Sequence, residues 1–244
     1  MSAVSTGPRK AFVEQVMGMP VSIHVRGEVE SPEVGIGVGQ VWSMLRRVDM
    51  VFSTWRPDSD LMRLRRAELS ADRAHPWVAE VEAWCAQASA RTEGLFSATA
   101  AGTDEYDPTG LVKGWAVERA AQLLAGVPHI SFCINAGGDL MAGHGQWAEP
   151  STWQVGIENP RDAGTVAATI PLSEGGLATS GNAARGAHIL DPRDGAPVLR
   201  EGSATVWGPS LMWADVWATA LFVDPDAGRT RLAEVDPAYR CLVL

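Results

Sequence analysis

The sequence predicts an α+β fold in which mixed β-sheets are flanked by helices. Stretches with apolar residues at helical spacing stand among shorter stretches that alternate or are fully apolar, as strands do. The two kinds of segment mix without the strict strand–helix–strand alternation of a doubly wound fold. A chain of 244 residues, 46% of them hydrophobic, can bury a sizeable core. We therefore expect a single domain over residues 1–244, with a flexible N-terminal segment over residues 1–12.

The individual elements follow from the same patterns. Helices are expected over residues 37–52, 77–94, 110–126 and 211–223. Strands are expected over residues 21–25, 129–134, 152–158, 165–172, 204–208 and 239–244. The stretch GIGVGQVW, residues 35–42, is similar to a dinucleotide-binding fingerprint, but no strand precedes it and the third glycine is missing. We interpret it as a loop that leads into a helix.

Charge and cysteine content exclude several classes of protein. The formal net charge of −9 excludes a general nucleic-acid binder, and an anionic ligand would need a metal or a local cation beside it. Cys85, Cys133 and Cys241 are dispersed among apolar residues, which argues against a disulfide framework and a thiolate zinc site. No apolar run resembles a signal-peptide core or a membrane span. We expect a cytoplasmic protein with buried free thiols.

The helix expected over residues 211–223 carries two polar side chains on one face. Apart from the Trp N–H groups, Asp215 and Thr219 are its only polar residues, and they stand four positions apart. A helix that is apolar all round is normally buried, and a buried carboxylate needs a partner. Either an arginine from elsewhere pairs with Asp215 while Thr219 bonds back to its own helix, or the two side chains hold a hard cation such as Mg²⁺. The spacing leaves both possibilities open.

Lys113 is conspicuous because only two of the 20 basic residues are lysine. It follows a turn formed by Asp107, Pro108 and Gly110, in the first turn of the helix expected there. A helix N-terminus suits phosphate, and a cation at that place opposes the helix dipole unless an anion lies nearby. The alternative is a solvated lysine on an amphipathic helix.

Two further stretches have both a structural and a functional interpretation. In INAGGDL, residues 134–140, a strand ends in a glycine turn that either is simply tight or lets the backbone approach a ligand closely. In FSTWRPDSDLMRLR, residues 52–65, Trp55 stands in a loop, where it either plugs the core or forms a platform for a flat ring.

The stretch ATSGNAARGAHILDPRDGAP, residues 178–197, concentrates hydroxyl, amide and imidazole groups. Such groups form hydrogen bonds to the backbone of a turn or bind a polar ligand. It contains His188. The other four histidines are isolated in the sequence, and core or surface roles are assigned to His24, His75, His129 and His144.

Eight segments, taken in order, resemble the ApbE family, the FAD:protein FMN transferases. They are MGMPVSI, FSTWRPDSDL, DPTGLVKGWAVERA, INAGGDL, IENP, ATSGN, HILDPRDGAP and ADVWATALF. The resemblance implies an α+β fold that binds FAD and magnesium. It also implies cleavage of the FAD pyrophosphate, attachment of FMN to a threonine or serine of an acceptor protein, and release of AMP.

The same resemblance assigns roles to residues. The metal ligands would be Asp215, Thr219 and a backbone carbonyl near Gly110. The walls of the FAD site would be Met17, Trp55, Asp107, Lys113 and Leu190, with Leu95, Phe96 and Ser97 on a further wall. A polar wall beside the phosphates would include Thr179, Ser180 and His188. His188 is the candidate for proton transfer, or else a structural histidine bonded to backbone, and Lys113 would add positive potential.

The chain departs from the family pattern at three of these places. The family often has tyrosine where Trp55 stands, threonine where Met19 stands, and aspartate followed by Pro-Leu where Ser97 stands. Three functions fit the residues: an FMN transferase, a magnesium-dependent FAD pyrophosphatase in which water replaces the acceptor hydroxyl, or a flavin-binding protein without turnover. The expected partners are FAD and an acceptor protein with a Thr or Ser flavinylation site, and not nucleic acid.

Overall fold

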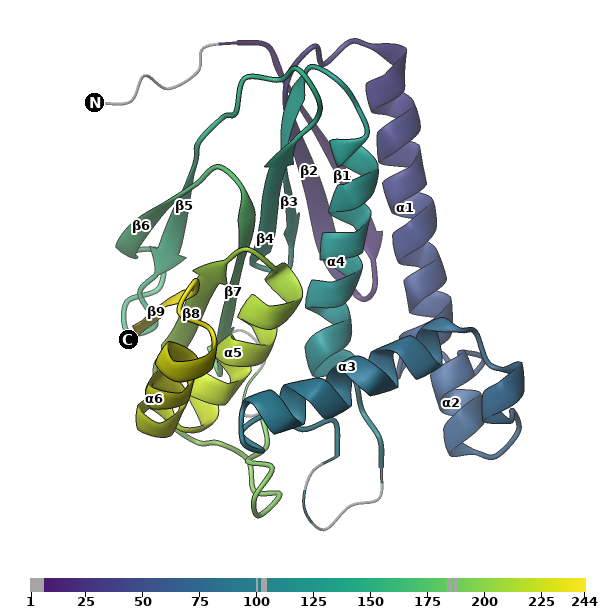
Figure 1. Ribbon diagram of the computed structural model, residues 1–244, viewed down its shortest axis with the longest axis vertical. Coiled ribbons are helices and arrows are strands. Elements are labelled where there is room, and N and C mark those ends of the chain that lie inside the picture. Colours follow the sequence, from purple (N-terminus) through teal and green to yellow (C-terminus); the bar gives the residue numbers. More distant parts are fainter. Residues whose placement is uncertain (1–6, 100, 102–104, 184–185, 187) are drawn as a thin grey trace.

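Seven of the strands that the structure describes form one antiparallel sheet, in the order β1-β2-β3-β4-β7-β8-β9 (Figure 1). The computed structural model describes residues 7–99, 101, 105–183, 186 and 188–244. The strands of this sheet are β1 (Arg9–Val16), β2 (Met19–Gly27), β3 (Ile130–Ala136), β4 (Asp139–His144), β7 (Gly175–Gly181), β8 (Ser203–Gly208) and β9 (Arg240–Val243). A separate antiparallel hairpin consists of β5 (Trp153–Glu158) and β6 (Val166–Leu172).

Helices pack along the large sheet and confirm the α+β prediction. They are α1 (Pro32–Phe52), α2 (Asp60–Arg65), α3 (Trp77–Arg91), α4 (Thr109–Ala125), α5 (Leu211–Val223) and α6 (Pro225–Val235), with a 3₁₀ turn η1 (Ala71–Arg73) before α3. Helix α4 packs between α1 and α5, α5 lies on β7 and β8, and α3 crosses one end of α4 (Figure 1). Every helix and strand expected from the sequence has a counterpart among these elements.

The main core lies between the sheet and the helices. In β2, Val21, Ile23 and Val25 are buried toward the helices, while the residues between them face the other side, as the two-residue period of a strand requires. Helix α5 is buried along almost its whole length, which agrees with its apolar sequence. A smaller apolar cluster lies beneath the β5–β6 hairpin and contains Ala142, Val155, Ile157, Leu172 and Leu177.

Two expectations near the N-terminus are wrong. Residues 9–12 are not flexible, because they belong to β1 and pair with β2 from Arg9 onward; residues 1–6 lie outside the described residues. The helix expected from residue 37 is not preceded by a loop at residues 35 and 36, because α1 already begins at Pro32, a residue that suits the first helical position. The glycines of residues 35–42 are helical, and a Cβ on Gly37 would lie 2.8 Å from the side chain of Val127, so this face of α1 packs closely.

Two further expectations need a smaller correction. Helix α3 ends at Arg91 rather than near Gly94, because the backbone turns left-handed at Glu93 and Gly94, with φ of +52° and +82°. All three cysteines are free, but only Cys85 and Cys133 are buried, whereas Cys241 on β9 is half-buried. In the part of the chain that the structure describes, no helix is both long enough and apolar enough to cross a membrane.

Candidate active site

All the predicted site residues line one cavity of about 1010 Å³. Its walls come from the β1–β2 turn, the loop after α1, the segments on both sides of the start of α4, strand β7, helix α5 and residues 188–195. The predicted residues among them are Met17, Trp55, Leu95, Phe96, Ser97, Asp107, Gly110, Lys113, Thr179, Ser180, His188, Leu190, Asp215 and Thr219. The fold thus brings segments from most of the sequence to one cavity. What each of these residues binds stays a prediction.

Lys113 lies between two buried carboxylates. Its Nζ contacts Oδ2 of Asp139 and is 3.5 Å from Oδ1 of Asp215. Burial raises the pKa of Asp215 to about 7; Lys113 acts against this rise and Asp139 adds to it. Among the described residues, the ionic partner of Asp215 is therefore a lysine from another helix. Lys113 is the fifth residue of α4, beyond its first turn, and is not a solvated surface lysine.

Gly114 allows α4 and α5 to cross closely at this point. A Cβ there would lie 2.9 Å from the backbone of Leu211 and Met212. The Gly114 amide donates to Oδ2 of Asp215 at 3.2 Å. In a regular α-helix this amide would bond the carbonyl of Gly110. Gly110 lines the same cavity as Asp215.

Strand β7 contributes Thr179 and Ser180 to the cavity wall. Ser180 and Thr219 lie with their hydroxyl oxygens 3.1 Å apart, so Thr219 reaches across to the sheet. The hydroxyl of Thr179 lies 2.9 Å from that of Thr205, and its amide donates to Oδ1 of Asp139 at 3.1 Å. Asp139 thus connects the lysine to the strand that carries this polar wall.

His188 is oriented by its own backbone. Its Nδ1 lies 2.8 Å from the Gly186 carbonyl, which can only accept, so Nδ1 donates. The neutral imidazole then has Nε2 as an unprotonated acceptor. His188 also lines the cavity, so the backbone-bonded interpretation and the proton-transfer interpretation are compatible.

The Trp55 side chain is not part of the core. Its side chain is 91% exposed, and its amide donates to the Ser53 hydroxyl at 3.3 Å. Met17 and Gly18, which also line the cavity, form the β1–β2 turn with φ of +55° and +71°, the combination of a two-residue hairpin turn that matches strand twist. An exposed indole at a cavity wall is available to a flat ring.

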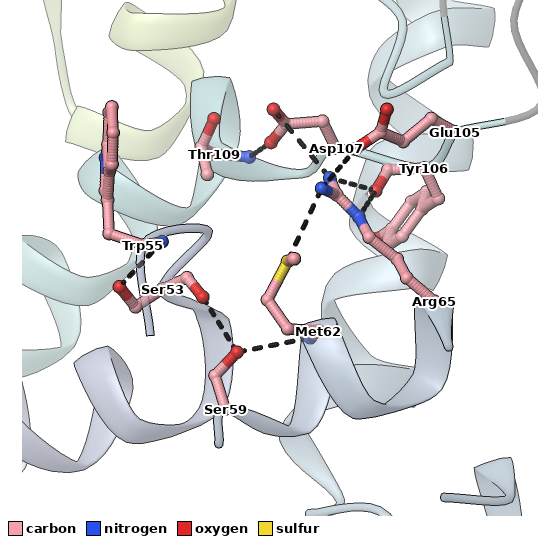
Figure 2. Close-up of polar contacts among 9 residues, drawn as sticks. All are labelled: Ser53, Trp55, Ser59, Met62, Arg65, Glu105, Tyr106, Asp107 and Thr109. Carbon is pink, nitrogen blue, oxygen red and sulfur yellow. Dashed lines mark hydrogen bonds and ion pairs between the residues drawn. The ribbon is translucent and has the colours of Figure 1, made fainter. Parts of the chain in front are cut away.

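The segment before α4 is tied to α2. Asp107 accepts from the Thr109 amide through Oδ1 at 2.9 Å, at the first residue of α4. Arg65 at the end of α2 reaches Glu105, the Tyr106 carbonyl and Asp107 (Figure 2). The cavity wall that contains Asp107 is therefore held from outside the cavity.

The family model for ApbE matches residues 17–106 and 104–243, which together cover most of the chain. The chain belongs to the ApbE family.

Curated ApbE-family relatives match over part of the chain. The FAD:protein FMN transferase of Haemophilus influenzae is 34% identical over 128 residues, which is 48% of this chain and 37% of that protein. The transferase of Vibrio cholerae is 30% identical over 140 residues, 53% of this chain and 42% of that protein. The match therefore spans less than half the length of these relatives.

Solved structures show the same ApbE fold over nearly the whole chain. The ApbE protein of Thermotoga maritima superposes with a TM-score of 0.77 at 21% identity, covering 97% of this chain and 94% of that one. The Pseudomonas stutzeri flavinyl transferase ApbE gives 0.75 at 23% identity, covering 97% and 91%. At these identities the likeness establishes the fold.

The donor set in this ApbE-family chain suits a hard cation. Asp215 supplies a carboxylate, Thr219 a hydroxyl and Gly110 a backbone carbonyl, and all three residues line the cavity. These are the oxygen ligands that Mg²⁺ takes when phosphate and water complete its shell. Within the described residues no three His, Cys, Asp or Glu side chains gather as a metal site, so the cation would depend on this mixed set.

Three residues that matter to this geometry were not singled out from the sequence. Asp139 stood in a quoted motif, INAGGDL, but its pairing with Lys113 needs the β3–β4 turn beside α4. Gly114 differs from other glycines only through the helix that crosses it. Arg65 lies in a stretch for which the sequence predicted no helix or strand, and only the tertiary structure shows where its side chain points.

Proposed function

We propose that this protein transfers the FMN moiety of FAD to a Thr or Ser hydroxyl of an acceptor protein and releases AMP. The observation that carries the proposal is the pairing, in one cavity, of a buried oxygen donor set beside Lys113 with an exposed indole. The donor set suits a pyrophosphate with its cation, and the indole suits the flavin ring. FAD contains both groups in one molecule.

Each side chain has a role in this proposal. Asp215, Thr219 and the Gly110 carbonyl would hold Mg²⁺, which supplies charge neutralisation at the pyrophosphate. Lys113 and the amides at the start of α4 add fixed positive potential. Trp55 and Met17 contact the flavin, and Thr179 and Ser180 line the same cavity.

The transfer itself needs a base for the acceptor hydroxyl. The hydroxyl oxygen forms a bond to the phosphorus on the FMN side, and the bond between that phosphorus and the AMP oxygen breaks. The hydroxyl proton passes to Nε2 of His188, the acceptor nitrogen left by the Nδ1 bond to Gly186. The products are an FMN–protein phosphoester and AMP.

Incubation of the protein with FAD and Mg²⁺, with and without candidate acceptor proteins, tests the proposal by mass spectrometry. An acceptor that gains the mass of FMN at Thr or Ser, together with AMP, supports transfer. AMP with free FMN in equal amounts would make the protein an FAD pyrophosphatase. Intact FAD under all conditions would leave a flavin-binding protein. Asp215→Asn is the control, since it should produce no AMP.

The expected cytoplasmic location belongs to the same proposal, because it decides which acceptors the protein meets.

A further inference from the structure

Helix α2 contacts two segments of the cavity wall, although α2 itself does not line the cavity. At its N-terminus, the fully buried Ser59 accepts from the Met62 amide at 3.1 Å and donates to the Ser53 carbonyl at 2.7 Å. Ser53 in turn accepts from the Trp55 amide. One end of α2 is therefore bonded to the loop that presents Trp55 (Figure 2).

The other end of α2 is bonded through Arg65 to residues 105–107, a different segment of the cavity wall. Its Nε and one terminal nitrogen both donate to the Tyr106 carbonyl, at 3.1 and 2.7 Å, and the other terminal nitrogen contacts Glu105. Oδ2 of Asp107 lies 3.9 Å from the guanidinium. The Arg65 side chain is only 16% exposed, so water does not replace these bonds freely.

The segment that Arg65 holds leads directly into α4. Asp107 uses Oδ1 on the Thr109 amide, and the next residue, Gly110, is followed in the same helix by Lys113. A planar guanidinium with two bonds to one carbonyl fixes both distance and direction, which an ammonium cannot do. The position of Asp107 and of the α4 N-terminus therefore depends on a residue outside the cavity.

We propose that Arg65 is a positioning residue for the pyrophosphate and metal side of the site, and that α2 is a brace between this side and the Trp55 loop. The inference rests on the proposed function, because it assigns the two sides to the two parts of FAD. It predicts that the two ends of α2 affect different parts of the ligand. Loss of Arg65 frees the 105–107 segment, whereas loss of the Ser59 hydroxyl frees the Trp55 loop.

The test compares FAD with riboflavin, which has the flavin ring but no pyrophosphate. Arg65→Met keeps the length and packing of the stem and removes the donors. Arg63→Met is the matched control, because Arg63 is on the same helix and its ion pair is with Asp60 at 4.0 Å. The fold should survive Arg65→Met, because the Tyr106 hydroxyl remains bonded to Cys85 at 3.7 Å. Affinities come from flavin fluorescence with Mg²⁺ present, and thermal unfolding is followed in parallel.

For Arg65→Met we expect the Kd for FAD to rise about tenfold and the Kd for riboflavin to stay within about twofold of the parent. Arg65→Lys should recover only part of the FAD affinity, since lysine keeps the positive charge but lacks the planar guanidinium with its several donors. Ser59→Ala should weaken both ligands alike. The inference is overturned if Arg65→Met and Arg63→Met bind FAD equally, or if Arg65→Met weakens riboflavin as much as FAD. Failure of the parent protein to bind FAD would instead overturn the proposed function.

Discussion

Gly114 and Asp215 touch where α4 crosses α5: the glycine amide donates to the carboxylate at 3.2 Å, and the crossing leaves no room for a Cβ. Gly114→Ala must therefore push the helices apart, and we expect a loss of about 1–3 kcal/mol in the free energy of unfolding, together with weaker Mg²⁺ binding. Urea unfolding and calorimetric titration with Mg²⁺ measure the two effects.

Gly39→Ala is the matched control for that substitution. Gly39 is an exposed glycine inside α1 with nothing within 4 Å of an added Cβ. There the greater helix propensity of alanine should raise stability by about 0.5–1 kcal/mol. Equal effects of the two substitutions would show that the close crossing at Gly114 is not a constraint.

Asp215→Asn should separate metal binding from folding. A carboxyl whose pKa is higher in the folded than in the unfolded chain lowers stability progressively as the pH rises from its ordinary value of 3.8 through about 7. Without metal, at about pH 8, the variant should be at least as stable as the parent, and any advantage should vanish at about pH 4. Added Mg²⁺ should raise the melting temperature of the parent only. A variant that Mg²⁺ stabilises as much as the parent would remove Asp215 from the metal site.

Trp55→Ala should weaken flavin binding without changing stability, because the indole is 91% exposed and packs little in the free protein. We expect a loss of about 1–3 kcal/mol in binding free energy, by analogy with base stacking, and near-parent affinity for Trp55→Tyr. Fluorescence titration measures both. Trp147→Ala, which removes another exposed indole that does not line the cavity, is the control. Unchanged flavin affinity in Trp55→Ala would exclude stacking on this residue.

The thiols should differ in reactivity. Burial raises the pKa of Cys85 to about 11 and that of Cys133 to about 12, so the reactive thiolate is scarce at both positions near neutral pH. At about pH 8 iodoacetamide should label the half-buried Cys241 first, and the other two only after denaturation. Peptide mass mapping measures this, and equal labelling of all three in the native protein would contradict the burial of Cys85 and Cys133.

The sequence predicted those parts of the fold where local pattern and burial agree. Helix α5 was expected with the bounds it has, and Asp215 stood out because one acid interrupts an apolar helix. Strand β1 was missed because its side chains are mostly exposed and its order comes from pairing with β2. Strand β7 was missed because its three glycines have low strand propensity, and the sheet determines its conformation.

The site was predicted as a set of residues but not as a set of contacts. Lys113 seemed to need an anion, and the structure places two carboxylates beside it, one of them from a turn that no local pattern connects to α4. The brace formed by α2 is likewise a tertiary feature. Helix α2 has only six residues, Asp60–Arg65, which is too short for its sequence pattern to identify a helix.

A crystal structure of the protein with FAD and Mg²⁺ would test the proposed site. We expect the flavin ring against Trp55, the pyrophosphate beside Lys113, and the cation on Asp215, Thr219 and the Gly110 carbonyl. FAD bound outside this cavity, or a cation on the pyrophosphate with neither Asp215 nor Thr219 as a ligand, would contradict it.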